Sequence, residues 1–231
     1  MERHMFGDLI HMGTSAIAVR VGAEPDIKGF TVHEQLIRKS SPFFEAALSN
    51  PATTAHPILI KLPKCSPTDF HVYVQWLYTG RVHVVLTSPI TSDKDTDEYC
   101  LLIRGYLLGE YLQDTHYRDT LMDALVQLVS GPIKSFLART EFGRIYQETK
   151  IESPLRRLLV DVAVWRHNWE YAKEQDFPKE MFWGVMTGLA DRCQRPAGEA
   201  QSTSPFEVVK GTCHYHCHGD DTPCYKPKPP V

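Results

Sequence analysis

Residues 30–48 read "FTVHEQLIRKSSPFFEAAL" and contain the change from strand to helix that decides the fold. Before this change, apolar and polar residues alternate in residues 15–21 and 28–33, which predicts two strands joined by a turn. His33 stands where the second strand meets the first helix. A histidine in this position can hydrogen-bond to backbone groups left free at the junction, so we interpret it as a buried structural residue.

The rest of this stretch predicts two short helices. Leu36 and Ile37 follow His33 at helical spacing, and Ser41 with Pro42 has the residue types typical of an N-cap and a first helical position. The apolar side of the second helix consists of Phe43, Phe44, Ala47 and Leu48. A hairpin followed by two helices therefore opens the domain.

A third strand and a longer helix follow. The alternation in residues 57–63, "PILIKLP", predicts a strand with Ile58, Ile60 and Leu62 on one face. The next helix begins at a cap made by Ser66, Pro67 and Asp69, and Gly80 is placed to end it. Its apolar positions at helical spacing are Phe70, Tyr73, Val74 and Leu77.

The remaining pattern is helical. A polar loop at residues 88–98 leads into two packed helices, and Ser153 with Pro154 predicts the start of a later one. A last helix, residues 178–190, is expected to bury Phe182, Val185, Met186 and Leu189. After about residue 195 the chain becomes rich in Pro, Gly, Ser and Thr, which predicts a tail that does not order itself unaided.

The composition is that of an ordinary globular chain, with 231 residues of which 42% are hydrophobic and 23% charged. The formal net charge of -3 provides no overall positive field, so direct binding to nucleic acid is not expected. No apolar stretch reaches the roughly 18 residues of a membrane span, and the N-terminal residues lack the apolar core of a secretory signal. We expect an intracellular protein, in the nucleus or the cytoplasm, with reduced cysteines and no membrane contact.

Cysteines and histidines cluster in residues 213–224, "CHYHCHGDDTPC". Thiolates and imidazoles are the ligands of tetrahedral zinc, and the candidate set is Cys213, His216, His218 and Cys224. In an extended segment Cys213 would point away from the histidines, so the set can converge only if the chain turns. A structural zinc ion, a flexible or metal-scavenging tail without a defined site, and a disulfide are the three alternatives.

The sequence contains no nucleotide-binding loop, nucleophile elbow or zinc-protease helix motif. The pair His167 and Glu170 has the spacing of an incomplete zinc-helix motif and is interpreted as a solvated helix face. We therefore expect a protein that is not an enzyme and has no cofactor apart from the zinc considered above.

The order of these parts resembles a BTB/POZ domain, specifically the fungal BTB proteins with a helical C-terminal extension. The resemblance is carried by "FTVHEQLIRKSSPFFEAAL", "ILIKLP", "FHVYVQWLYTGRV", "YLLGEYLQDTHYRDTLMDAL" and, after the domain, "SPLRRLLVDVAVW". It implies an α/β (α+β) fold, with a small three-stranded sheet flanked by helices and followed by a helical extension. The implied domains are an N-terminal arm at 1–14, the BTB/POZ domain at 15–130, the extension at 131–192 and a flexible tail at 193–231.

In function, the resemblance implies homo- or hetero-oligomerisation with the same chain or other BTB proteins. The first alternative is a substrate adaptor of a cullin-RING ubiquitin ligase, and the second is a zinc-binding regulatory protein that acts through its tail. If a cullin binds, the resemblance places the contact near Tyr73, Leu77, Tyr78 and Tyr111. The polar loop at residues 87–97 is longer than in compact family members and lies near that face.

The resemblance also assigns structural roles. The residues of the BTB motif are His33, Leu36, Ser41, Phe44, Trp76 and Gly80. In the family this histidine belongs to the core architecture next to the dimer face. Aromatic residues at helical spacing, including Trp165 and Trp183, are interpreted as core rather than as partner anchors.

Overall fold

The computed structural model describes residues 12–50, 58–84, 98–131, 142–166, 177–194, 205–208, 213–219 and 224–225. The chain forms two compact units, of which the first comprises residues 1–84 and 108–117 and the second residues 85–107 and 118–231. The polar loop at 87–97, most of the N-terminal arm, and the pair His167 and Glu170 lie outside the described residues. The predicted domain boundaries at 130 and 192 remain predictions.

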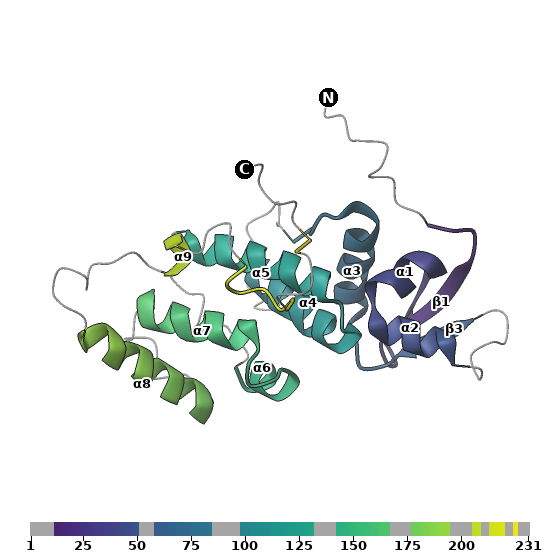
Figure 1. Ribbon diagram of the computed structural model, residues 1–231. Coiled ribbons are helices and arrows are strands. Elements are labelled where there is room, and N and C mark those ends of the chain that lie inside the picture. Colours follow the sequence, from purple (N-terminus) through teal and green to yellow (C-terminus); the bar gives the residue numbers. More distant parts are fainter. Residues whose placement is uncertain are drawn as a thin grey trace, which may run out of the picture. The chain divides into compact units, whose positions relative to one another are not determined.

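The first unit contains the three-stranded sheet predicted from the alternation. Its strands are β1 (Ala16–Val21), β2 (Lys28–His33) and β3 (Leu59–Leu62), in the order β2-β1-β3. Figure 1 labels β1 and β3. β1 pairs antiparallel with β2 and parallel with β3, so that Val19 lies opposite Ile60. Val19, Ile60 and Leu62 are buried whereas Leu59 is exposed, which confirms the alternation.

Three helices accompany this sheet in the first unit: α1 (Glu34–Ser40), α2 (Pro42–Ser49) and α3 (Pro67–Thr79). Ser41 caps α2, because its Oγ accepts a hydrogen bond from Phe44 N at 3.3 Å. At the C-terminal end of α3, Gly80 adopts a φ of 65° and donates its N–H to Trp76 O at 2.7 Å. Both helix signals in the sequence are therefore confirmed, and the left-handed conformation explains the glycine.

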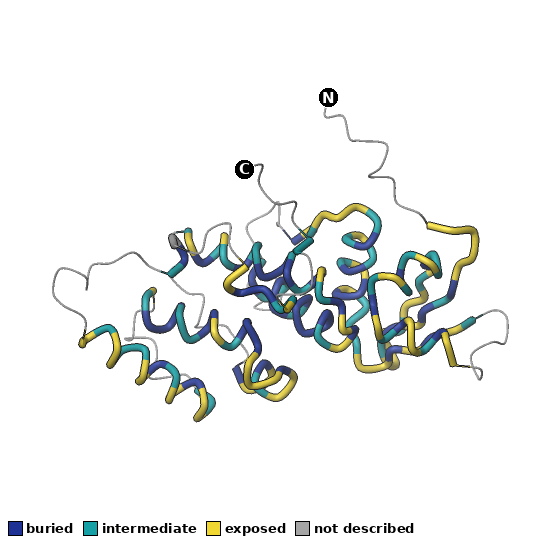
Figure 2. Tube along the Cα trace, viewed as in Figure 1, coloured by how far each residue is buried: buried dark blue, intermediate teal, exposed yellow. Residues whose placement is uncertain are grey.

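Large aromatic residues are prominent in the core of the first unit. Figure 2 marks the buried residues of the chain in dark blue. Phe44, Phe70, Tyr73 and Tyr117 are fully buried. The rings of Tyr73 and Tyr117 meet edge-on at 5.0 Å, a favourable arrangement for aromatic pairs. The fold class of the sequence analysis, a small sheet with flanking helices, is thus confirmed.

The second unit is helical in its described part. It contains most of α4 (Glu98–Leu112) and α5 (Thr115–Ser130), together with α6 (Phe142–Glu148), α7 (Pro154–Trp165), α8 (Lys179–Gln194) and α9 (Pro205–Val208). The predicted stripe on α4 is buried and consists of Tyr99, Leu102, Ile103 and Tyr106. Among the described residues, no helix combines the length and the apolar character needed to cross a bilayer.

Two glycines bring α7 and α8 into close contact, and Figure 1 shows these helices side by side. A methyl group added at Gly184 would meet Val160 Cγ2 at 3.0 Å, and one added at Gly188 would meet Val164 Cγ2 at 2.8 Å. The valines and the glycines are each four residues apart, so each pair lies on one face of its helix. Because Gly184 and Gly188 have no side chains, α8 can approach α7 closely at these two positions.

The buried face of α8 differs from the prediction. Met181 and Val185 are buried, but Phe182 is 55% exposed and Met186 is 47% exposed. The contact through Gly184 and Gly188 turns the neighbouring positions, Met181 and Val185, inward. Phe182 and Met186 instead line an apolar groove of about 240 Å³. The expectation that Trp183 belongs to the core is also wrong, because Trp183 is 63% exposed.

Some described residues of the tail are buried. Phe206 and Tyr215 are buried, and their rings stack at 6.5 Å. Tyr215 donates its hydroxyl to Asp161 Oδ2 on α7 at 2.7 Å. These residues of the tail therefore pack against other parts of the chain, while the flexibility expected for the tail as a whole remains a prediction.

Candidate functional site

The residues of the BTB motif lie in the first unit. Ser41 and Phe44 are buried, whereas His33, Leu36 and Trp76 are half-buried and Gly80 is exposed at the end of α3. His33 is the N-cap residue of α1, but its imidazole does not cap the helix. Instead its Nδ1 lies 2.7 Å from the hydroxyl of Tyr78, which also accepts the backbone N–H of His33 at 3.0 Å. The contacts of His33 are thus made to a side chain and not to a free backbone group, and the residue is half-buried rather than buried as expected, so its structural role remains a prediction.

The four predicted partner-binding residues differ in exposure. Tyr73 and Leu77 are buried, since they lie on the inward stripe of α3, so the prediction that they contact a partner is corrected. Tyr78 is half-buried and holds His33. Tyr111 on α4 is 44% exposed, and its ring lies 5.2 Å from that of Phe43 on α2.

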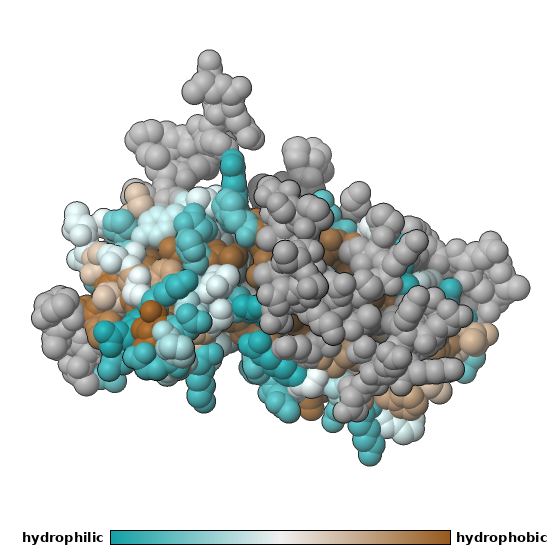
Figure 3. Space-filling model, turned by 180° about the vertical axis from the view of Figure 1, so that it is seen from behind, coloured by the Kyte–Doolittle hydropathy of each residue, from teal (hydrophilic) through white to brown (hydrophobic). Residues whose placement is uncertain are grey.

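Exposed apolar side chains occur in both units. Among the described residues, the large apolar side chains that are exposed are Met12, Leu59, Tyr111, Ile151, Phe182, Trp183 and Met186. Figure 3 shows, on one face, hydrophobic side chains interspersed with hydrophilic ones. Single exposed apolar residues are ordinary on protein surfaces. The Phe43–Tyr111 pair is distinct because it places a half-buried and an exposed aromatic ring in contact.

A buried carboxylate that the sequence analysis missed organises the first unit. Asp114 precedes α5, and its Oδ1 accepts a hydrogen bond from Tyr117 N at 3.0 Å, as an N-cap does. Its Oδ2 accepts hydrogen bonds from Ser40 Oγ and, at 2.9 Å, from Tyr73 OH. Burial raises the pKa of Asp114, although these three hydrogen bonds oppose the shift. The sequence signal, an Asp directly before a helix, could have predicted the cap of α5 but not the contacts with Ser40 and Tyr73.

The Cys/His cluster lies in the second unit. The four predicted ligands, Cys213, His216, His218 and Cys224, offer atoms that all lie within 4.8 Å of one another. A turn produces this convergence, because His216 N donates to Cys213 O at 3.0 Å. The structure thus supplies the turn that an extended segment lacks. Figure 1 shows the described tail beside α5.

Two aspartates of α5 contact this segment. Asp119, which is buried, accepts the backbone N–H of Cys217 at 2.6 Å and its thiol at 3.0 Å. Asp123 Oδ1 lies 3.2 Å from Nε2 of His216, at ion-pair distance. Burial alone would lower the pKa of His216, but the two carboxylates raise it overall. Asp123 favours a proton on Nε2, and Nδ1 faces the other ligand atoms.

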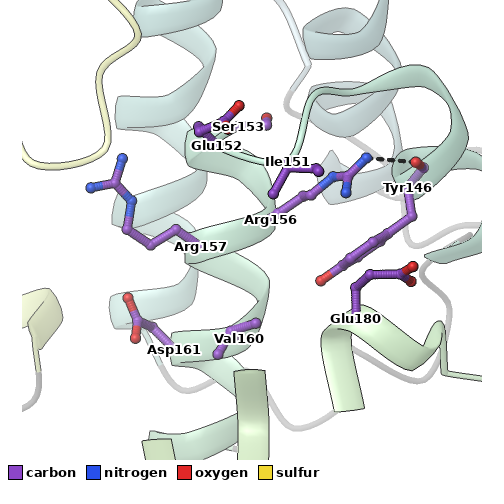
Figure 4. Close-up of a pocket in the computed structure, with 9 residues that line it drawn as sticks. All are labelled: Tyr146, Ile151, Glu152, Ser153, Arg156, Arg157, Val160, Asp161 and Glu180. Carbon is purple, nitrogen blue, oxygen red and sulfur yellow. Dashed lines mark hydrogen bonds between the residues drawn. The ribbon is translucent and has the colours of Figure 1, made fainter. Parts of the chain in front are cut away.

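A pocket of about 550 Å³, lined by both charged and apolar residues, lies between α6, α7 and α8 (Figure 4). Figure 4 shows Arg156 directed toward Tyr146, whose carbonyl oxygen it binds at 2.6 Å, and its guanidinium also lies 4.5 Å over the ring. The same side chain donates to Thr149 Oγ1 at 2.9 Å, so it satisfies groups at the C-terminal end of α6. Burial raises the pKa of Tyr146 to about 12, while Arg156 opposes the shift and Glu180 adds to it. These contacts are structural.

The sheet order and the capped helices define a mixed α/β fold. Residues 17–116 match the family model of the BTB/POZ domain. The chain therefore carries a BTB/POZ domain, which is a domain of protein interaction, and we conclude that it contains a protein-interaction module. No curated protein is similar enough to the chain to count as a match.

Proposed function

We propose that the chain is a non-enzymatic intracellular protein whose BTB/POZ domain self-associates or pairs with another BTB domain. The BTB/POZ match over residues 17–116 carries this proposal. We also propose that the chain is one of the fungal BTB proteins with a helical C-terminal extension, which its sequence motifs resemble.

We assign the contact between the two BTB/POZ domains to the surface that contains Phe43 and Tyr111. Both residues lie within the matched range, and Tyr111 exposes 44% of its surface while its ring stays 5.2 Å from that of Phe43. Tyrosine is common among the residues that contribute most to binding energy, because it offers a large rigid area with a polar end. The edge strand β3 exposes Leu59 and leaves one side of its backbone unpaired by strands in the described part of the chain.

Co-expression of two differently tagged copies of the full chain tests this function. Capture of one copy is expected to recover the other, and Tyr111→Ala in both copies is expected to reduce the recovery several-fold. Trp183→Ala is the matched control, because Trp183 is an exposed aromatic residue outside the matched range.

Mass spectrometry of the captured material distinguishes the adaptor alternative. Recovery of a cullin with its RING subunit, without the second copy, would overturn self-association in favour of a ubiquitin-ligase adaptor. Recovery of neither the second copy nor another BTB protein would also contradict the proposal.

A further inference from the structure

We propose that Cys213, His216, His218 and Cys224 bind one zinc ion, and that this ion fastens the C-terminal segment to α5. The inference concerns the second unit and does not depend on self-association through the BTB/POZ domain. It rests on three observations: the spacing of the ligand atoms, the different contacts of the other Cys and His residues nearby, and the two carboxylates of α5.

Two distances between ligand atoms match those of a tetrahedron around zinc. With Zn–N near 2.0–2.1 Å and Zn–S near 2.3 Å, two nitrogens of a tetrahedral site are about 3.3 Å apart and a nitrogen and a sulfur about 3.6 Å. His216 Nδ1 lies 3.3 Å from His218 Nε2 and 3.6 Å from Cys224 Sγ. The atom of Cys213 also lies within 4.8 Å of the other three. Two of the distances between the four ligand atoms therefore already have the values of a tetrahedral site, and the others are at most 4.8 Å.

The other Cys and His residues of the segment have different contacts. Cys217 directs its thiol to Asp119 Oδ1 at 3.0 Å. His214 is exposed, and its ring lies edge-on to Tyr215 at 4.6 Å. Residues 213–224 contain three cysteines and three histidines. Two of each belong to the proposed ligand set, and one of each, Cys217 and His214, lies outside it.

The carboxylates of α5 connect the cluster to the helix. Asp123 lies against Nε2 of His216, the ring nitrogen that faces away from the proposed ion, and it also accepts a hydrogen bond from Tyr225 OH. A carboxylate in this position orients a zinc-bound histidine and increases its basicity. Asp119 holds the backbone between His216 and His218 through Cys217 N. Zinc binding would therefore fix both the ligands and their attachment to α5.

The donor set favours zinc over other metals. Two thiolates with two imidazoles in a tetrahedron are typical of structural zinc, whereas calcium and magnesium take oxygen ligands. Binding replaces the two thiol protons by the ion, so two protons are released and the site of Zn²⁺ with two thiolates is neutral. A disulfide between Cys213 and Cys224 would consume the same two thiols and exclude the ion, so the redox state separates the two alternatives.

The test measures metal in the full-length chain, purified under reducing conditions, stripped with a chelator and reloaded with zinc. We expect about one zinc ion per chain, and cobalt in its place is expected to show the absorption of a tetrahedral site with thiolate ligands. Cys224→Ser and His218→Ala should each lower zinc affinity at least tenfold. Cys217→Ser and His214→Ala should retain it, since these residues lie outside the proposed ligand set.

Hydrogen exchange supplies a readout that does not depend on the variants. Removal of zinc from the wild-type chain should accelerate amide exchange several-fold in residues 213–219 and leave β1 unchanged. Less than a tenth of an equivalent of zinc in the reduced chain would overturn the proposal. Equal loss of zinc in Cys217→Ser and Cys224→Ser would also overturn it, as would a Cys213–Cys224 disulfide in protein isolated from its cells. Unchanged exchange after zinc removal would contradict the fastening role.

Discussion

The hydroxyl group of Tyr78 lies 2.7 Å from Nδ1 of His33 and 3.0 Å from the backbone nitrogen of the same residue. The oxygen accepts the backbone N–H, so its own proton is available to Nδ1 when the imidazole carries its proton on Nε2. One hydroxyl near the end of α3 thereby holds His33, which ends β2 and is the N-cap residue of α1. This contact explains why a histidine stands at the junction between strand and helix.

Removal of that hydroxyl should destabilise the first unit. Tyr78→Phe is expected to lower the free energy of unfolding by about 1 kcal/mol, because the loss leaves two groups of His33 without this partner. Urea denaturation measures the change. In a His33→Ala background the same substitution should cost less, since the imidazole contact is already absent. Equal costs in both backgrounds would show that the imidazole contributes nothing.

Asp114 should give stability a distinctive pH dependence. Its folded pKa is raised above the usual 3.8 by burial, so the folded state binds more protons than the unfolded state between 3.8 and the raised pKa. The contribution of Asp114 therefore falls as pH rises through this window. Asp114→Asn removes the titration and keeps an oxygen to cap Tyr117 N. The unfolding free energy of Asp114→Asn relative to wild type should rise from pH 4 upward until the raised pKa is passed. A constant or falling difference would contradict the raised pKa.

The glycines of α8 provide a test of its packing. Gly188→Ala is expected to lower the free energy of unfolding by about 1–3 kcal/mol, because the new methyl group would meet Val164 Cγ2 at 2.8 Å. Gly143→Ala on α6 is the matched control, since nothing lies within 4 Å of its added methyl group. Thermal or urea unfolding compares the two. Equal stability of both variants would show that α7 and α8 are not in close contact.

The position of Asp123 predicts an effect on the proposed zinc site. Asp123→Asn keeps the size of the side chain but removes the charge beside His216 Nε2, and zinc affinity is expected to fall about 10-fold or more. Competition with a chromogenic chelator measures the change. Asp191→Asn, an exposed position on α8, is the control. Unchanged affinity in Asp123→Asn would show that the carboxylate does not support the histidine.

Local signals in the sequence predicted the features that depend on neighbouring residues. Ser41 caps α2 and Gly80 ends α3 because capping involves residues within one turn. The alternation in β3 likewise identified its buried face. Such features require no knowledge of distant parts of the chain.

Features that depend on distant partners were not predictable in the same way. Asp114 acquires its role from Ser40 and Tyr73, which lie 74 and 41 residues away in sequence. The face of α8 depends on where the valines of α7 lie, so Phe182 was assigned to the wrong side. For the Cys/His cluster, residue chemistry predicted which four residues come together, whereas the attachment of this segment to Asp119, 98 residues from Cys217, required the structure.

Sedimentation velocity of the purified full-length chain over a range of concentrations tests self-association most directly. We expect a species of twice the 26.3 kDa monomer mass, which Tyr111→Ala shifts toward the monomer and Trp183→Ala does not. A single 26.3 kDa species of the wild-type chain at every concentration would contradict self-association of this BTB/POZ domain.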